Sequence, residues 1–284
     1  MPISSFTIVG TVRDSNKYLR SEVYRFHNLF SKLGPTSFFL VESDSRDGTT
    51  ETLARLAKEI GSFNFVSLGD LQNLYPSRVE RIAECRNRYV SEIRNSKVLS
   101  EATYTVVVDL DNKSNLLTLE NVKVALNREV SWSALFANQK QKYYDIFALR
   151  HPIWCPNNII DEIEWFERYF PNYSAKELAT FRKMITIPTE SDLIQVESAF
   201  GGLGIYRTTC FLNYDYAAID SNRFLESEHV TFNRKIIKGG GNLFIDPQLL
   251  NFGWIHHSLE SFLWWRKIDL IRKKIRNTLL HKSS

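Results

Sequence analysis

The chain has 284 residues, 43% of them hydrophobic and 24% charged, so it can bury a substantial core as one large domain, alone or with a small appendage. Its three cysteines are widely spaced without a C-x-x-C pair, which argues against a zinc site and a disulfide framework and favours a reducing cytoplasm. The net charge of +4 does not indicate a nucleic-acid-binding protein, and without a signal peptide or a long apolar run we expect neither secretion nor a membrane span.

Strands and helices are predicted to alternate in the first part of the chain. Strands rich in β-branched and aromatic residues are predicted at residues 6–12, 37–41 and 64–68. Helices with an apolar face are predicted at residues 18–33, 53–60 and 77–93. This alternation predicts a parallel sheet covered by helices.

A further apolar run, residues 105–108, ends in two carboxylates, Asp109 and Asp111. Residues i and i+2 of a strand point the same way, so the pair is expected to project together from the carboxyl edge of the sheet. Oxygen ligands suit Mg²⁺ and Mn²⁺. Considered alone, this spacing favours a solvated strand end over a metal site.

The remainder of the chain has a less regular pattern. Residues 132–137 and 143–149 predict strands or buried connections, and residues 159–169 and 225–237 predict helices. A short strand is predicted at 242–245, ended by Pro247. The glycine-rich turn at 201–204 either brings the backbone close to a sugar or only joins two strands, and the sequence does not choose.

Polar residues at the predicted strand ends suggest a binding pocket. After the first strand, Arg13 suits a phosphate, and after the second, Glu42 suits a nucleobase or ribose. In the helix at 77–93, Arg81 and Arg88 share one face, which would neutralise a diphosphate. A capped surface turn and a solvated basic face are equally good interpretations of the single residues.

Taken in order, residues 7–14, 41–49, 81–88 and 108–111 resemble the nucleotide-sugar-binding half of GT-A glycosyltransferases. Segments 144–150 and 197–207 resemble fungal capsule-type mannosyltransferases and their bacterial relatives. The resemblance implies an α/β fold with a Rossmann-like, mainly parallel sheet flanked by helices. It also implies that the Asp-x-Asp pair holds a divalent cation against the diphosphate of a donor.

The resemblance assigns roles to individual residues. It implies that Asp111 and His256 bind Mn²⁺ or Mg²⁺, and that a GDP- or UDP-sugar is held by Thr11, Arg13, Glu42, Arg81 and Asp109. Glu228 is the implied base that removes the proton of the acceptor hydroxyl. Because His229 follows Glu228 where a Glu-Asp pair is commoner, the base and the choice between inversion and retention stay open, and either His256 or His257 could reach the metal.

The C-terminal residues 258–284 predict a basic amphipathic helix that follows a catalytic domain over residues 1–257. This tail has seven Lys or Arg residues against two acidic ones, and Trp264 and Trp265 suit an anionic membrane surface. Packing of the tail on the body or on a second subunit is the alternative.

The expected function is a metal-dependent glycosyltransferase that moves a sugar to a hydroxyl of a glycan or lipid-linked acceptor in surface polysaccharide synthesis. It would act in the cytoplasm, peripherally at the inner face of the plasma membrane, without nucleic acid as a partner. Two alternatives are a non-catalytic nucleotide-binding or scaffold module and a sugar nucleotidyltransferase. The latter is disfavoured because no glycine-rich basic loop follows residues 6–12.

Overall fold

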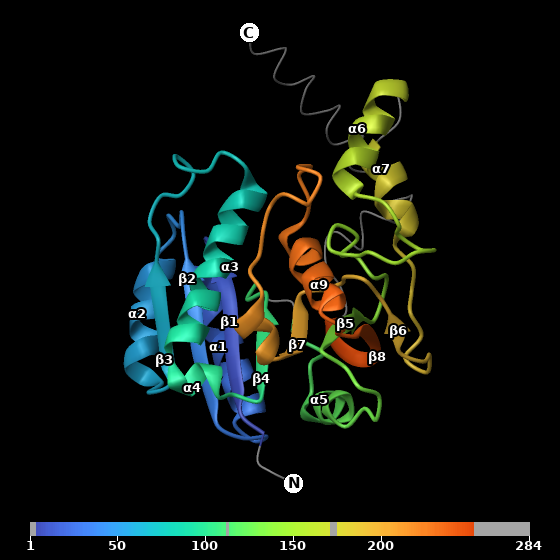
Figure 1. Cartoon of the computed structure of the whole chain (residues 1–284). Coiled ribbons are helices and arrows are strands. Elements are labelled where there is room, and N and C mark those ends of the chain that lie inside the picture. Colours follow the sequence, from blue (N-terminus) through green and yellow to red (C-terminus); the bar gives the residue numbers. More distant parts are fainter. Residues whose placement is uncertain (1–3, 112–113, 171–174, 253–284) are drawn as a thin grey trace, which may run out of the picture.

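The computed structural model describes residues 4–111, 114–170 and 175–252. In these residues an eight-stranded sheet of order β3-β2-β1-β4-β7-β5-β8-β6 is flanked by helices (Figure 1). The strands are β1 Phe6–Val12, β2 Thr36–Glu42, β3 Phe63–Ser67, β4 Tyr104–Val108, β5 Ala134–Gln139, β6 Ile194–Gln195, β7 Leu203–Arg207 and β8 Leu243–Phe252.

The helices cover both faces of the sheet (Figure 1). They are α1 Asn16–Phe30, α2 Thr49–Glu59, α3 Arg78–Asn95, α4 Lys97–Ser100, α5 Leu119–Leu126, α6 Ile159–Tyr169, α7 Ala175–Ala179, α8 Thr209–Asn213 and α9 Glu228–Lys238, with the 3₁₀ helix η1 Phe181–Lys183. None of the helices in the described parts of the chain has both the length and the apolar character needed to cross a membrane.

The first half of the sheet, β3-β2-β1-β4, is entirely parallel, as the alternation of strands and helices predicts. Its strands read as unbroken apolar runs because both faces are buried: Val9 and Val107 pack toward α3, whereas Ile8 and Val106 pack toward α1. The backbones of β1 and β4 approach closely at Gly10, where a Cβ atom would lie 2.6 Å from the carbonyl oxygen of Val108. Only glycine fits there.

The second half, β7-β5-β8-β6, joins the first through an antiparallel pairing of β7 with β4. Within it, β5 pairs parallel with β8, while β7 and β6 are antiparallel to their neighbours. The sheet is therefore mainly parallel, which confirms the predicted fold class.

The prediction that Pro247 ends the last strand is wrong, because β8 continues to Phe252. Its register against β5 shifts at Asn138, so that Ala137 faces Asp246 and Asn138 faces Leu250. This irregularity accommodates a proline, which has no N–H for the ladder. The side-chain amide of Asn138 donates instead to the carbonyl of Pro247 at 3.0 Å.

Residues 143–149 form a buried connection without a strand, the second of the two structures that their pattern allows. Cys85, Cys155 and Cys210 are buried and unpaired, as their spacing predicts. The tail at 258–284, its boundary with the domain over 1–257, and His256 and His257 lie outside the described residues.

Candidate active site

A cleft of about 520 Å³ lies at the carboxyl edge of β1, β2 and β4. This edge of the sheet faces the top of Figure 1, and the amino-terminal ends of α3 and α9 point toward the same side. The first half of the chain contributes Thr11, Arg13 and Asp109 to its lining, and the second half contributes Tyr144 and Glu228. The site therefore combines residues that are far apart in sequence.

Asp109 and Asp111 both line the cleft, directly after β4. The amide of Asp109 donates to the carbonyl of Gly202 at 3.0 Å, so the glycine turn lies beside the acidic pair. Gly202 has φ +83°, and a Cβ atom there would lie 3.3 Å from the hydroxyl of Tyr144 and 3.9 Å from Oδ2 of Asp109. Because Gly201 and Gly202 have no side chains, the backbone of the turn itself lies against the acidic pair. The turn also connects two segments of the chain.

The segment Tyr144–Asp145 completes this part of the cleft. Oδ2 of Asp145 accepts a hydrogen bond from the amide of Gly201 at 2.9 Å. Burial and the negative charges of Asp145, Asp109 and Asp111 raise the pKa of Tyr144 well above its ordinary value. The Tyr144 hydroxyl therefore stays protonated among three carboxylates.

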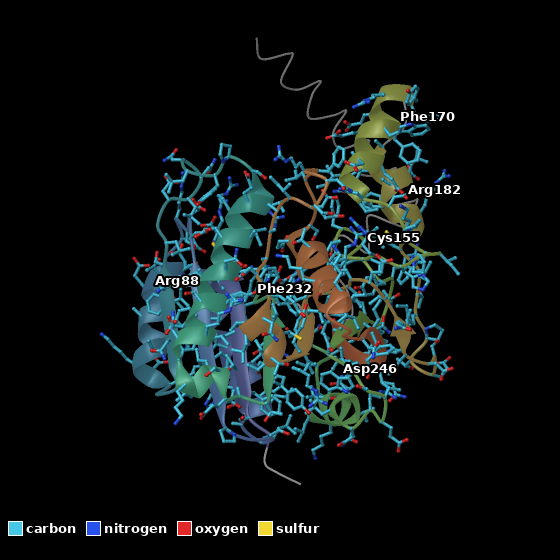
Figure 2. All side chains as sticks on the ribbon, in the orientation of Figure 1. Arg88, Cys155, Phe170, Arg182, Phe232 and Asp246 are labelled. Carbon is cyan, nitrogen blue, oxygen red and sulfur yellow. The ribbon has the colours of Figure 1, made fainter. Side chains whose placement is uncertain are left out.

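The arginines of α3 divide between the cleft and the surface. Arg78 and Arg81 line the cleft, and Nη1 of Arg81 donates to the carbonyls of Tyr75 and Pro76 at 2.6 and 2.8 Å. Arg88, labelled in Figure 2, is not among the lining residues and lies 4.0 Å from a carboxylate oxygen of Glu92. The shared face predicted for Arg81 and Arg88 therefore reaches the cleft only at its amino-terminal end.

Glu42 is buried and is not part of the cleft lining. Its carboxylate accepts hydrogen bonds from the amide of Ser45 at 2.9 Å and from the hydroxyl of Ser67. It therefore shapes the loop after β2, from which Ser43 and Asp44 reach the cleft. A direct contact of Glu42 with a donor stays a prediction.

Two buried arginine–glutamate pairs lie where α9 begins. Nε of Arg86 is 3.0 Å from Oε1 of Glu228, and Nη2 of Arg150 is 2.5 Å from Oε1 of Glu226. Burial outweighs the Arg150 charge and raises the pKa of Glu226. All four residues line the cleft.

Sequence reasoning did not assign a role to Arg86 or Arg150. Arg86 carries a recognisable signal, because it lies on the otherwise apolar face of α3 with Ala83, Tyr89 and Val90. A charged residue on a buried helix face requires a partner. Arg150 has no comparable signal, because it lies in an irregular segment whose burial depends on the whole fold.

The carboxylate oxygens of the acidic pair are suitable ligands for a divalent metal ion. Among the described residues, no three His, Cys, Asp or Glu side chains are grouped as a complete metal site. Mg²⁺ and similar hard cations are commonly bound by one or two carboxylates together with substrate phosphates and water. Asp109 and Asp111 at the open edge of the cleft meet this requirement, with His256 as a predicted additional ligand.

No protein-family model and no curated protein matches the chain. Similar solved structures include a mannosyltransferase from Pyrobaculum calidifontis in complex with GDP-mannose and Mn²⁺, with 12% identity and a TM-score of 0.49 over 86% of this chain and 55% of that chain. This chain therefore spans little more than half of that protein.

Two further similar structures come from bacteria. One is glucosyl-3-phosphoglycerate synthase from Mycobacterium tuberculosis with phosphoglyceric acid, with 9% identity, a TM-score of 0.42, and coverage of 88% of this chain and 69% of that one. The other is S. aureus TarS 1–349, with 12% identity, a TM-score of 0.48, and coverage of 88% and 60%.

Proposed function

We propose that the protein is a metal-dependent glycosyltransferase of the GT-A type, which transfers a sugar from a nucleoside-diphosphate donor to an acceptor hydroxyl. The observation that carries the proposal is that Asp109 and Asp111 line one cleft with Arg78 and Arg81, while the Gly202 turn lies directly beside Asp109. Carboxylates for a metal, guanidinium groups for phosphates and a backbone turn for a sugar are what such a donor requires.

In this proposal, the part of the cleft that is lined by the first half of the chain holds the nucleotide. Asp111, assisted by His256, would bind Mn²⁺ or Mg²⁺, and Asp109 would contact the ribose or the ion through water. Arg13 and Arg81 would contact the diphosphate of a GDP- or UDP-sugar near Thr11. The bound cation would supply neutralisation of the charge that develops on the departing nucleoside diphosphate.

Glu228 is the proposed base. Its side chain is 10% exposed, lines the cleft, and is oriented by the ion pair with Arg86. It would take the proton of the acceptor hydroxyl as that oxygen attacks the anomeric carbon and the bond to the diphosphate breaks. A base in this position leads to inversion, whereas a retaining reaction would proceed without it.

Calorimetric titration of GDP, UDP and their sugars, with and without Mn²⁺, tests the donor site. We expect Mn²⁺-dependent binding that Asp111→Asn abolishes and that Asp192→Asn, outside the cleft lining, leaves unchanged. The absence of a metal-dependent response to any of these nucleotides would overturn the proposal. Binding without transfer or donor hydrolysis would favour a non-catalytic module, and pyrophosphate release from a nucleoside triphosphate would favour a nucleotidyltransferase.

The acceptor is proposed to be a glycan or a lipid-linked saccharide of a surface polysaccharide, used at the cytoplasmic face of the plasma membrane. The basic charge of residues 258–284 supports peripheral binding to anionic lipid. Liposome sedimentation of the chain with and without these residues tests this part. Equal binding of both forms would contradict it.

A further inference from the structure

His229 is a buried histidine without hydrogen-bond partners in the described part of the chain. Its side chain is 4% exposed, and both ring nitrogens are buried and unbonded there. The ring stacks on Phe200 with a centroid distance of 3.9 Å and meets the edge of Tyr216 at 5.9 Å. Nε2 is 3.8 Å from Oε1 of Glu228, which is beyond hydrogen-bond range.

This arrangement costs stability. An unsatisfied buried polar group destabilises a protein, because it gives up its hydrogen bonds with water on folding and gains none in return. The aromatic stack with Phe200 does not need ring nitrogens, so a phenylalanine would serve the packing better. The fold therefore does not explain why a histidine occupies this position.

The location of His229 supplies the reason. The residue lines the same cleft as Glu228, which precedes it on α9. Burial and the nearby charge of Arg86 lower its pKa well below the ordinary value, so the imidazole is neutral. A neutral imidazole has one donor nitrogen and one acceptor nitrogen, and either of them can pair with a sugar hydroxyl, which both donates and accepts.

We infer that His229 is a sugar-binding residue, one of whose ring nitrogens hydrogen-bonds a hydroxyl of a sugar held in the cleft. This inference rests on the proposed function and adds a residue that recognises the substrate. The sugar is that of the donor or that of the acceptor, since either would lie beside Glu228 when the acceptor hydroxyl is deprotonated.

His229→Phe separates sugar recognition from packing. It keeps the aromatic stack and removes both unbonded nitrogens, so we expect an equal or higher melting temperature. The affinity for GDP or UDP with Mg²⁺ should be unchanged. If the donor sugar is the ligand, the additional affinity of GDP-mannose over GDP, or of UDP-glucose over UDP, should fall by about 3–10-fold, the effect of one lost hydrogen bond.

Tyr216→Phe is the matched control. Tyr216 packs against His229, and its buried hydroxyl lies beside that of Tyr89, but Tyr216 is not part of the cleft lining. Each variant removes buried polar atoms from the same aromatic cluster. Only His229→Phe is expected to change sugar binding.

Nitrogen-15 NMR of the histidine side chains in the unmodified protein identifies the sugar without relying on a variant. A shift of the His229 ring signals with Mg²⁺ and a nucleotide sugar, but not with the nucleoside diphosphate, assigns the donor. A shift only when methyl mannoside or methyl glucoside is added to the Mg²⁺–nucleoside diphosphate complex assigns the acceptor.

Unchanged signals in both NMR experiments, together with unaltered sugar affinity in His229→Phe, would overturn the inference and leave the donor site intact. A lack of metal-dependent nucleotide binding by the unmodified protein would instead overturn the proposed function, and the inference with it.

Discussion

The amide of Asp109 donates to the carbonyl of Gly202 at 3.0 Å, and this bond connects the two halves of the chain at the acidic pair. Asp109 follows a strand of the first half, and Gly202 precedes a strand of the second. Because β4 and β7 are antiparallel, the end of one and the beginning of the other share the same edge of the sheet.

Gly202→Ala is expected to affect both stability and ligand binding. The left-handed backbone at φ +83° costs an alanine about 1–2 kcal/mol, and its Cβ would press on Tyr144 and Asn251. Metal-dependent binding of nucleoside diphosphate should weaken several-fold in calorimetry. Gly240→Ala is the control, because Gly240 has φ +85° with open space around it, and should lose only stability.

Arg150→Met should be among the most destabilising single substitutions in the cleft. It leaves Glu226 buried with its nearest cation removed, which typically costs about 3–5 kcal/mol. Chemical denaturation measures the loss. Adding Glu226→Leu should recover part of it, whereas Lys97→Met, in an exposed pair with Glu101, should leave the unfolding midpoint unchanged.

Glu228→Gln should separate chemistry from donor binding. We expect sugar transfer or donor hydrolysis to fall by about 10²–10⁴-fold, with the affinity for the metal–nucleotide complex unchanged. Steady-state kinetics and calorimetry on the same preparation test this. Unaltered turnover would exclude Glu228 as the base and favour a retaining reaction.

The buried, neutral His229 predicts a loss of stability in mild acid. Its pKa is near 6.5 in the unfolded chain, and burial together with the Arg86 charge holds its pKa in the native state well below that value. As pH falls below 6.5, the unfolded chain takes up a proton that the native state does not, so the free energy of unfolding decreases by up to about 1.4 kcal/mol per pH unit. Well above pH 6.5, His229 is neutral in both states and does not change how the free energy of unfolding depends on pH.

Urea unfolding between about pH 7.5 and pH 5.5 checks this effect. Arg86 and Glu228 face His229 in every variant, so their contributions cancel when His229→Phe is compared with the unmodified protein. The difference in stability should grow in favour of His229→Phe as pH falls. Tyr216→Phe should keep the slope of the unmodified protein, and parallel curves for all three would refute the prediction.

The first half of the fold was predictable because its strands are buried on both faces and read as short apolar runs, as in β1 and β4. Parallel strands place their carboxyl ends together, so a pocket shared by the residues that follow these strands, Arg13 and Asp109 among them, was expected from the alternation of strands and helices. The structure brings both into one cleft.

The second half was harder to predict because its contacts are between distant segments. The pairing of β7 with β4 depends on which strand edge is available after folding, and residues 203–207 alone contain no such information. Arg150 and Glu226 are separated in the sequence and meet only through this arrangement. The continuation of β8 past Pro247 depends likewise on a register shift in its partner, β5.

The order of the strands has a consequence for synthesis of the chain. Within the described sheet, β1 to β4 come from one continuous stretch and β5 to β8 from the next, and the two stretches pair only between β4 and β7. A nascent chain that ends before the turn at 201–202 has made Asp109 but neither Gly202 nor Glu228. Its acidic pair then lies at an unpaired strand edge, so the molecule acquires a complete cleft only when nearly all of the described sequence has emerged.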